Sequence, residues 1–284
     1  MTCHTFVKQA AERLEKAGIG EAETDALELL LFLKKWSRSD YFLYRENPLG
    51  IEEEQELERL LKEREKRIPL QHITGTAWFY GRPFTVSGEV LIPRFDTEIL
   101  VQEVLRRVPE KDRAILDLCT GSGCIAVTLK LEGDYASVAA SDISPEALEI
   151  AKRNADALQA DICFYESDLF REVPGTFDVI VSNPPYITAK EMEALEPEVK
   201  DHDPALALFG GTDGLDFYRR ILSEAAAHLK TGGLVFFEIG ALQAEAVLKL
   251  FHTAGFTGTG VVRDLAGHYR VVYGRRPEEG VHNV

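Results

Sequence analysis

The sequence predicts an α/β protein in which a small N-terminal helical bundle precedes a domain built on a mostly parallel β-sheet with helices on both faces. Two patterns carry this expectation. Residues 1–75 place apolar residues at helical spacing, whereas beyond Arg113 short apolar runs alternate with longer helical ones. We therefore expect a helical domain over residues 1–75, a β-hairpin linker over residues 76–92 and the α/β domain over residues 93–284.

Composition and charge narrow the function classes. The chain has 284 residues, 45% of them hydrophobic, and its formal net charge is -15, with -4 over residues 1–110 and -11 over the remainder. This balance argues against a general phosphate-binding protein. No apolar stretch approaches the roughly 20 residues that a bilayer requires, and the N-terminus lacks the apolar region of a signal peptide. We expect a cytoplasmic protein whose four cysteines, without CxxC spacing, are free thiols that form no metal site.

The N-terminal part is expected to hold three helices, over residues 6–17, 21–34 and 51–67. In the second of these, Ala22, Ala26, Leu29 and Leu33 fall on one helical face. After Pro69 the pattern changes to short β-prone pieces separated by glycines, which predicts the linking hairpin.

The α/β domain is expected to hold six strands with helices between them. The strands are predicted at residues 114–118, 137–140, 162–165, 179–182, 234–239 and 269–273. The helices are predicted at residues 124–131, 145–159, 214–229 and 242–254. Ser144 followed by Pro145 is typical of a helix start, and Gly232-Gly233 is interpreted as a helix end.

A glycine-containing loop follows the first strand and opens a helix. Its residues are Cys119, Thr120, Gly121, Ser122 and Gly123. Glycines there would let a ligand lie against backbone amides at a helix N-terminus. The next strand ends at Asp142, whose carboxylate could accept hydrogen bonds from both hydroxyls of a ribose. The pattern predicts an adenosine-type cofactor and leaves NAD and S-adenosylmethionine open.

The fourth strand runs into the turn Asn183-Pro184-Pro185-Tyr186, which carries the chemistry. The prolines hold the backbone extended and cannot donate ladder hydrogen bonds. The Asn183 side-chain carbonyl and the Pro184 backbone carbonyl could each accept one N–H of a planar NH₂ group, and Tyr186 offers a ring for stacking. A methylsulfonium carries its own activation, so such a site needs only to desolvate and align the nitrogen.

These motifs, in this order, resemble the class I methyltransferases that modify planar nitrogens with S-adenosylmethionine. Over roughly residues 20–275 the chain resembles the release factor glutamine methyltransferases, the PrmC or HemK family. Residues 167–170 and 183–187 carry the class-level resemblance, and residues 67–75, 91–98 and 210–218 carry the closer one. It implies the Rossmann-like class I methyltransferase fold over residues 93–284 and a substrate-recognition role for residues 1–75.

The resemblance also implies site residues. The cofactor-binding residues would be Cys119, Thr120, Gly121, Ser122, Gly123, Asp142, Ile143, Asp168, Leu169 and Asn183, and glycine is more usual in the family at Cys119. The catalytic and substrate-binding residues would be Asn183, Pro184, Pro185 and Tyr186. The implied reaction methylates N5 of the glutamine in the Gly-Gly-Gln motif of class I peptide chain release factors, with S-adenosylmethionine as cofactor, S-adenosyl-L-homocysteine as product and no membrane or nucleic-acid partner.

Two other substrates keep the same chemistry. One is an exocyclic amino group of a nucleic-acid base, which would require a grip on phosphates that the acidic α/β part does not favour. The other is a glutamine of a ribosomal protein. A binding module without catalysis would be expected to lose Asn183 or the loop glycines, and both are intact.

Several charged residues allow two interpretations. Arg94, Asp96 and Glu98 either contact a ligand or belong to a helix start with Asp96 or Thr97 as N-cap. Glu238, near the end of a strand, is either structural or part of the site. The acidic segment over residues 190–203, with net charge -4, is either a solvated loop or an acidic flap that guides a basic protein loop into the site.

Overall fold

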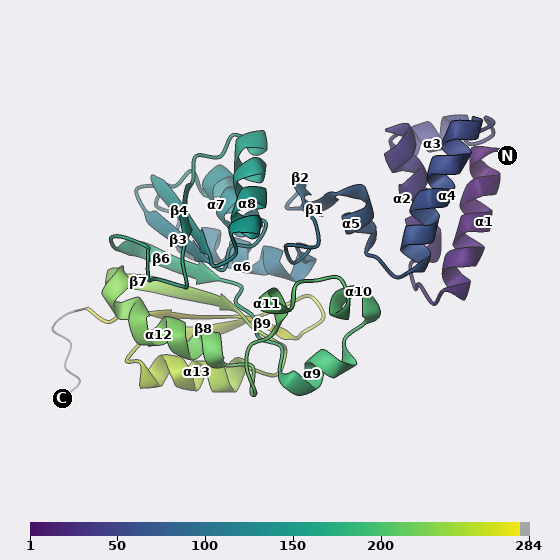
Figure 1. Ribbon diagram of the computed structural model, residues 1–284. Coiled ribbons are helices and arrows are strands. Elements are labelled where there is room, and N and C mark those ends of the chain that lie inside the picture. The colour runs from purple at the N-terminus through teal and green to yellow at the C-terminus, as the bar shows by residue number, and fades with distance from the viewer. Residues whose placement is uncertain (279–284) are drawn as a thin grey trace. The chain divides into compact units, whose positions relative to one another are not determined.

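The computed structural model describes residues 1–278 and divides them into two compact units (Figure 1). The first unit comprises Met1–Thr76 together with Glu196–His202, and the second comprises Ala77–Leu195 and the residues from Asp203 onward. Within residues 1–278, none of the helices combines the length and the apolar character that crossing a membrane requires. All four cysteines are free.

The first unit is helical. Its helices are α1 (Cys3–Lys16), α2 (Ala22–Lys34), α3 (Arg38–Tyr44), α4 (Ile51–Glu65), α5 (Leu70–Thr74) and α10 (Pro197–Lys200). Fully buried leucines from α1, α2 and α4, among them Leu14, Leu29 and Leu57, form its core. The three predicted helices are confirmed. Helix α3 was missed because it has only seven residues, although Ser37 and Asp40 form the capping box that starts it.

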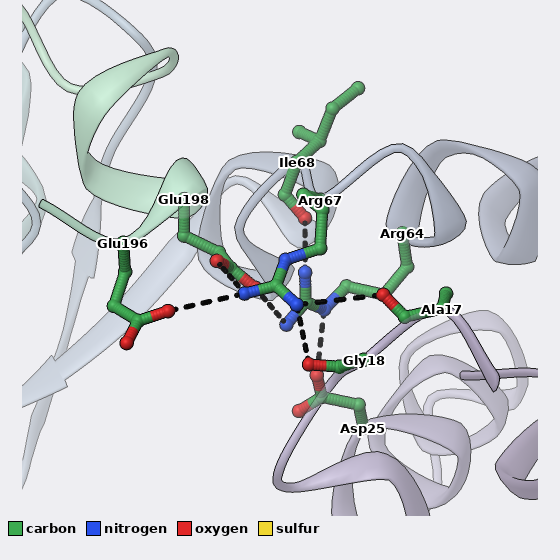
Figure 2. A network of polar contacts seen from close by, with 8 residues as sticks. All are labelled: Ala17, Gly18, Asp25, Arg64, Arg67, Ile68, Glu196 and Glu198. Carbon is green, nitrogen blue, oxygen red and sulfur yellow. Dashed lines mark hydrogen bonds and ion pairs between the residues drawn. The ribbon is translucent and has the colours of Figure 1, made fainter. Parts of the chain in front are cut away.

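A buried ionic network holds Glu198 of α10 against this unit (Figure 2). The Arg64 guanidinium, 6% exposed, donates to Asp25 at 2.7 Å and to Glu198 at 3.1 Å. Arg67 donates to Glu198 at 2.6 Å and also contacts Glu196 and the Gly18 carbonyl. Since a buried charge is stable only when it is paired, this network fixes residues 196–202 to α2 and α4.

We expect Arg64→Met to destabilise the first unit by about 3 kcal/mol, because it leaves the buried Asp25 carboxylate without its partner. Denaturant unfolding followed by amide hydrogen exchange in α2 and α4 measures this change. The matched control is Arg38→Met, since Arg38 pairs with Glu28 on the surface with 64% of its side chain exposed. That control should cost less than about 1 kcal/mol. Equal losses in the two variants would contradict the assignment.

The second unit begins with a hairpin of β1 (Thr76–Phe79) and β2 (Arg82–Thr85), followed by a seven-stranded sheet. The sheet strands are β3 (Ala114–Leu118), β4 (Ser137–Asp142), β5 (Cys163–Glu166), β6 (Phe177–Ser182), β7 (Leu229–Glu238), β8 (Thr257–Arg263) and β9 (Tyr269–Arg275). Their order is β5-β4-β3-β6-β7-β9-β8. The pairs along β5-β4-β3-β6-β7 are parallel, and β9 runs antiparallel to β7 and β8. The predicted α/β fold with a mostly parallel sheet and a linking hairpin is confirmed.

Helices cover both faces of this sheet (Figure 1). They are α6 (Phe95–Arg107), α7 (Cys124–Gly133), α8 (Pro145–Leu158), α12 (Asp216–His228) and α13 (Ala244–Thr253), with short α9 (Ala189–Ala194) and α11 (Ala205–Leu208). Along β6, Val179 and Val181 pack with α6 and α7, whereas Ile180 packs with α12 and α13. Successive side chains along β6 therefore face different helices, and the same alternation applies at the end of the strand.

Two expectations for the sheet were wrong. Gly232 and Gly233 lie inside β7 rather than at a helix end, because α12 already stops at His228. A Cβ on Gly233 would stand 2.9 Å from the Asp178 carbonyl oxygen, so the close approach of β6 requires the glycine. Strand β8 was not predicted because its glycines break the β-prone pattern, yet Gly260 leaves room for the Tyr273 ring.

Candidate active site

A cavity of about 660 Å³ opens at the carboxyl ends of β3, β4 and β6 in the second unit. Ligands of open α/β sheets bind at this edge, and the volume suits a nucleoside-sized molecule. Ten of the predicted site residues line it: Cys119, Thr120, Gly121, Ser122, Asp142, Ile143, Asp168, Leu169, Asn183 and Pro185. Among the described residues, Gly123, Pro184 and Tyr186 are not part of the lining.

The loop between β3 and α7 has left-handed backbone at three positions, with φ of 58° at Cys119, 53° at Gly121 and 79° at Gly123. Cys119 is the one residue of the three that is not glycine, although only glycine adopts that conformation freely. A Cβ on Gly121 would meet no atom within 4 Å, which leaves this side of the loop open to a ligand. A Cβ on Gly123 would lie 3.0 Å from that of Ala151, so Gly123 lets α8 pack closely.

Two carboxyl groups hold this loop in place. Asp117 is fully buried and accepts from the Thr120 hydroxyl at 2.6 Å and the Ala126 amide at 3.2 Å, and burial raises its pKa to about 7. Asp142 accepts from the Gly121 amide at 2.9 Å and the Ser144 amide at 3.0 Å, and burial raises its pKa as well. Each Asp142 oxygen can accept a second hydrogen bond on the cavity side.

The turn after β6 places Asn183 in the cavity wall, half-buried. Its Nδ2 donates to the Thr97 hydroxyl at 3.4 Å, so Oδ1 occupies the other branch of the amide. Pro184 is buried, and the half-buried Tyr186 ring packs against the core, which raises the pKa of its phenol. The Tyr186 carbonyl accepts from Gln243 Nε2 at 3.0 Å, which anchors the end of the turn.

Residues 208–210 contact this turn and hold it in place. The backbone of Ile187 donates to Leu208 and accepts from Gly210, at 2.8 and 2.9 Å. A Cβ on Gly210 would lie 2.6 Å from both the Pro185 carbonyl oxygen and the Tyr186 Cα. Glycine at this position therefore permits the contact that fixes the turn.

We expect Gly210→Ala to displace the turn and to lower kcat by about 100-fold, the typical effect of misplacing a positioned group by about 1 Å. The affinity for S-adenosylmethionine should stay near that of the wild type, because Gly210 does not line the cavity. Titration calorimetry and single-turnover methyl transfer separate the two quantities. A fully active Gly210→Ala enzyme would show that the close contact of residue 210 with Pro185 and Tyr186 does not affect activity.

The charged residues at the N-terminal end of α6 have different partners. The N-cap of α6 is Arg94, without a side-chain cap bond, so the expectation of Asp96 or Thr97 as N-cap was wrong. Arg94 lines the cavity and donates to Asp203 at 3.4 Å. Asp96 pairs with Arg270 at 3.0 Å. Glu98 accepts from the Tyr80 amide at 2.7 Å, which holds the hairpin and assigns that carboxylate a structural part.

The acidic residues 190–203 do not form a single free flap. Glu196 and Glu198 belong to the first unit, where they pair with arginines. Glu191 caps α9 through Thr188, and Asp203 is buried beside Arg94, where burial raises its pKa to about 6. Glu198 and Asp203 are therefore committed to local partners, whereas Glu191, Glu193, Glu196 and Asp201 are exposed, and the role of the segment as an electrostatic guide stays a prediction.

Arg220 and Thr97 are among the cavity residues that the sequence did not identify as part of the site. Arg220 of α12 lines the cavity and donates to Asp168 at 2.7 Å, which fixes the Asp168 carboxylate. Thr97 of α6, 2% exposed, lines the cavity and accepts from Asn183. Arg220 lies outside the motifs that the sequence singles out, whereas Thr97 lies within residues 91–98 and was expected only as a possible N-cap. Among the described residues, no group of three or more His, Cys, Asp or Glu side chains could hold a metal ion.

Comparison with known proteins gives matches along most of the chain. The family described as PrmC N-terminal domain matches residues 5–75, and the family described as Methyltransferase small domain matches residues 94–199. A methyltransferase structure from Pyrococcus furiosus is 20% identical and covers 70% of this chain and 91% of its own, with a TM-score of 0.53. That likeness concerns the fold alone.

Two curated relatives are similar over nearly their whole length. The release factor glutamine methyltransferase of Geobacter sulfurreducens is 43% identical over 263 residues, which is 92% of this chain and 92% of the relative. The protein of the same name from Koribacter versatilis is 42% identical over 280 residues, 98% of this chain and 99% of the relative. Together with the cavity geometry, these similarities show that the chain belongs to the release factor glutamine methyltransferase family.

Proposed function

We propose that this protein transfers a methyl group from S-adenosylmethionine to the side-chain amide nitrogen, N5, of the glutamine in the Gly-Gly-Gln motif of class I peptide chain release factors. One observation carries the proposal: Gly121, Asp142 and Asn183 line the same cavity. Membership in a family whose relatives bear the name of this activity supports it. A cytoplasmic location and a substrate-recognition role for residues 1–75 belong to the same proposal.

The cavity fits the proposed cofactor. Gly121 leaves its backbone open to a ligand, and the Asp142 oxygens can accept from the two hydroxyls of a ribose. Arg220 holds Asp168 at the cavity wall. Ile143 lines the same cavity and is half-exposed. S-adenosylmethionine, when bound, supplies a methyl group already activated by its sulfonium.

The protein then has to bind and orient the substrate nitrogen. Asn183 Oδ1 accepts one N–H of the glutamine amide, and the Pro184 carbonyl, which does not line the cavity in this structure, would have to turn toward the substrate to accept the other. Two acceptors hold both hydrogens in one plane, so the nitrogen presents its face to the methyl group. Tyr186 would contact the flat amide if its ring turns from the core, and this part stays a prediction. The two thiols that line the cavity, Cys119 and Cys124, are kept protonated, since burial raises the pKa of both groups.

The proposal is tested with labelled S-adenosylmethionine and three acceptors in parallel: a release factor, its variant with the motif glutamine changed to alanine, and duplex DNA. We expect label in the unaltered release factor alone, because the second unit is acidic and offers little to phosphates. Label in DNA would favour the nucleic-acid alternative. Equal label in the alanine variant would contradict the glutamine assignment, and a ribosomal-protein extract in a fourth reaction tests the remaining alternative.

A further inference from the structure

We propose that Glu238 and Thr97 act as positioning residues that fix the orientation of the Asn183 amide. In this arrangement Glu238 accepts the Thr97 hydroxyl proton, Thr97 accepts from Asn183 Nδ2, and Asn183 Oδ1 is left facing the substrate nitrogen. The inference rests on the proposed function, because it assigns roles within that same site. It concerns two residues that no sequence motif connects to Asn183.

The sheet brings these residues together. Strands β6 and β7 are parallel neighbours, with Ser182 opposite Phe237, so Asn183 and Glu238 are the next residues along each strand. Side chains alternate between the faces, and Val181 and Phe236 both pack on the face covered by α6. Asn183 and Glu238 therefore emerge toward α6, whose first turn contains Thr97.

Hydrogen bonds then connect the three side chains. Asn183 Nδ2 donates to Thr97 Oγ1 at 3.4 Å, and Thr97 is also the hydrogen-bonding side chain that lowers the pKa of Glu238 against the effect of burial. Thr97 and Glu238 are each 2% exposed. The Glu238 oxygen Oε2 has no hydrogen-bond partner among the described residues, so the bond to Thr97 is a main polar contact of a buried carboxyl group.

The polarity of this chain of bonds follows from proton counting. A threonine hydroxyl has one proton, and an ionised carboxylate can only accept. Once Thr97 donates to Glu238, its oxygen can only accept from Asn183, which must then present Nδ2. A flipped Asn183 amide would point its own NH₂ at the NH₂ of the substrate, and two donors do not bind one another.

The charge state of Glu238 sets this polarity. Burial raises the pKa of Glu238 to about 7 against the opposing effects of Thr97 and of the nearby Arg270 and Arg94. The other titratable groups that face it are Asp96, Tyr186, Cys124 and Tyr218. A protonated Glu238 could donate to Thr97, whose own proton would then be free to turn toward Asn183 Oδ1. At low pH the Asn183 amide should therefore no longer be held in one orientation.

The first test compares two substitutions at one position. Thr97→Val keeps the shape but removes the hydroxyl, and we expect kcat to fall by about 10- to 100-fold, as for the loss of one or two buried hydrogen bonds. The KM for S-adenosylmethionine and the Kd for S-adenosyl-L-homocysteine should not change. Thr97→Ser restores the hydroxyl and should restore most of kcat. The matched control is Thr128→Val, because Thr128 is fully buried in α7, does not line the cavity and has a hydroxyl without a partner among the described residues.

A second test uses the pH dependence. The acid limb of the wild-type kcat profile should be lost or displaced in Glu238→Gln, which cannot ionise. The readout is the difference between the two profiles, because Asp117 also has a pKa near 7. Identical profiles, a Thr97→Val enzyme as fast as the wild type, or a Thr97→Ser enzyme as slow as Thr97→Val would overturn the inference. Failure of the proposed function is distinguishable, since the wild-type protein would then leave the release factor unmethylated.

Discussion

Asn183→Ala should lower kcat for methylation of the release factor by about 100- to 1,000-fold, the range that follows the loss of one positioned polar group in an active site. Asn183 supplies the side-chain carbonyl of the turn after β6, and without it one N–H of the glutamine amide loses the acceptor assigned to it. The nitrogen would then sample orientations that do not face the methyl group. Single-turnover kinetics with saturating cofactor measure this loss directly.

The same variant separates orientation from cofactor binding. Asn183 is one of many residues that line the cavity. In the Asn183→Ala variant the loop after β3 and Asp142 remain in place. Titration calorimetry should therefore give an affinity for S-adenosyl-L-homocysteine close to that of the wild type, and the melting temperature should change little. Comparable turnover in Asn183→Ala and the wild type would refute the role assigned to this residue.

Asp142→Ala is expected to weaken S-adenosylmethionine binding by at least about 100-fold, because two hydrogen bonds to a charged acceptor are worth about 3–6 kcal/mol. The effect has a second source. Asp142 also accepts from the Gly121 and Ser144 amides, so its removal loosens the loop that a ligand must approach. Equilibrium binding of the cofactor, without any protein substrate, isolates this step.

Two further variants serve as controls for this prediction. Asp142→Asn keeps one acceptor oxygen and should give an intermediate affinity. Asp161→Asn makes the same chemical change at an exposed residue outside the cavity and should bind the cofactor like the wild type. If Asp142→Ala binds S-adenosylmethionine normally, the ribose does not lie against this carboxylate.

The sequence predicted the centre of the sheet well because the central strands β3 and β6 are short, apolar and largely buried. Strands β3 and β6 were predicted to within two residues, since Pro and Gly punctuate their ends. Helix α3 and strand β8 escaped prediction for opposite reasons. Helix α3 is too short to show a helical periodicity of apolar residues. Strand β8 contains glycines that are needed for close contacts with residues distant in sequence, such as Tyr273.

The candidate site was predictable where a motif is continuous and not where it is assembled by folding. The loop at Cys119–Gly123 and the turn at Asn183 could be found because neighbouring residues share one function. Thr97 and Glu238 come from different elements and meet Asn183 only through strand alternation and the placement of α6. Likewise, the sequence alone suggests that Glu198 is a solvated acid, whereas the structure places it beside Arg64 and Arg67.

The central claim is that the nitrogen held by Asn183 belongs to a release-factor glutamine, and tandem mass spectrometry tests it most directly. A purified release factor is incubated with this protein and S-adenosylmethionine, digested and sequenced by fragmentation. The account predicts a mass increase of one CH₂ unit confined to the side chain of the glutamine in the Gly-Gly-Gln motif, absent when Asn183→Ala replaces the wild-type enzyme. A methyl group on any other residue, or an unmodified motif with an active enzyme, would contradict it.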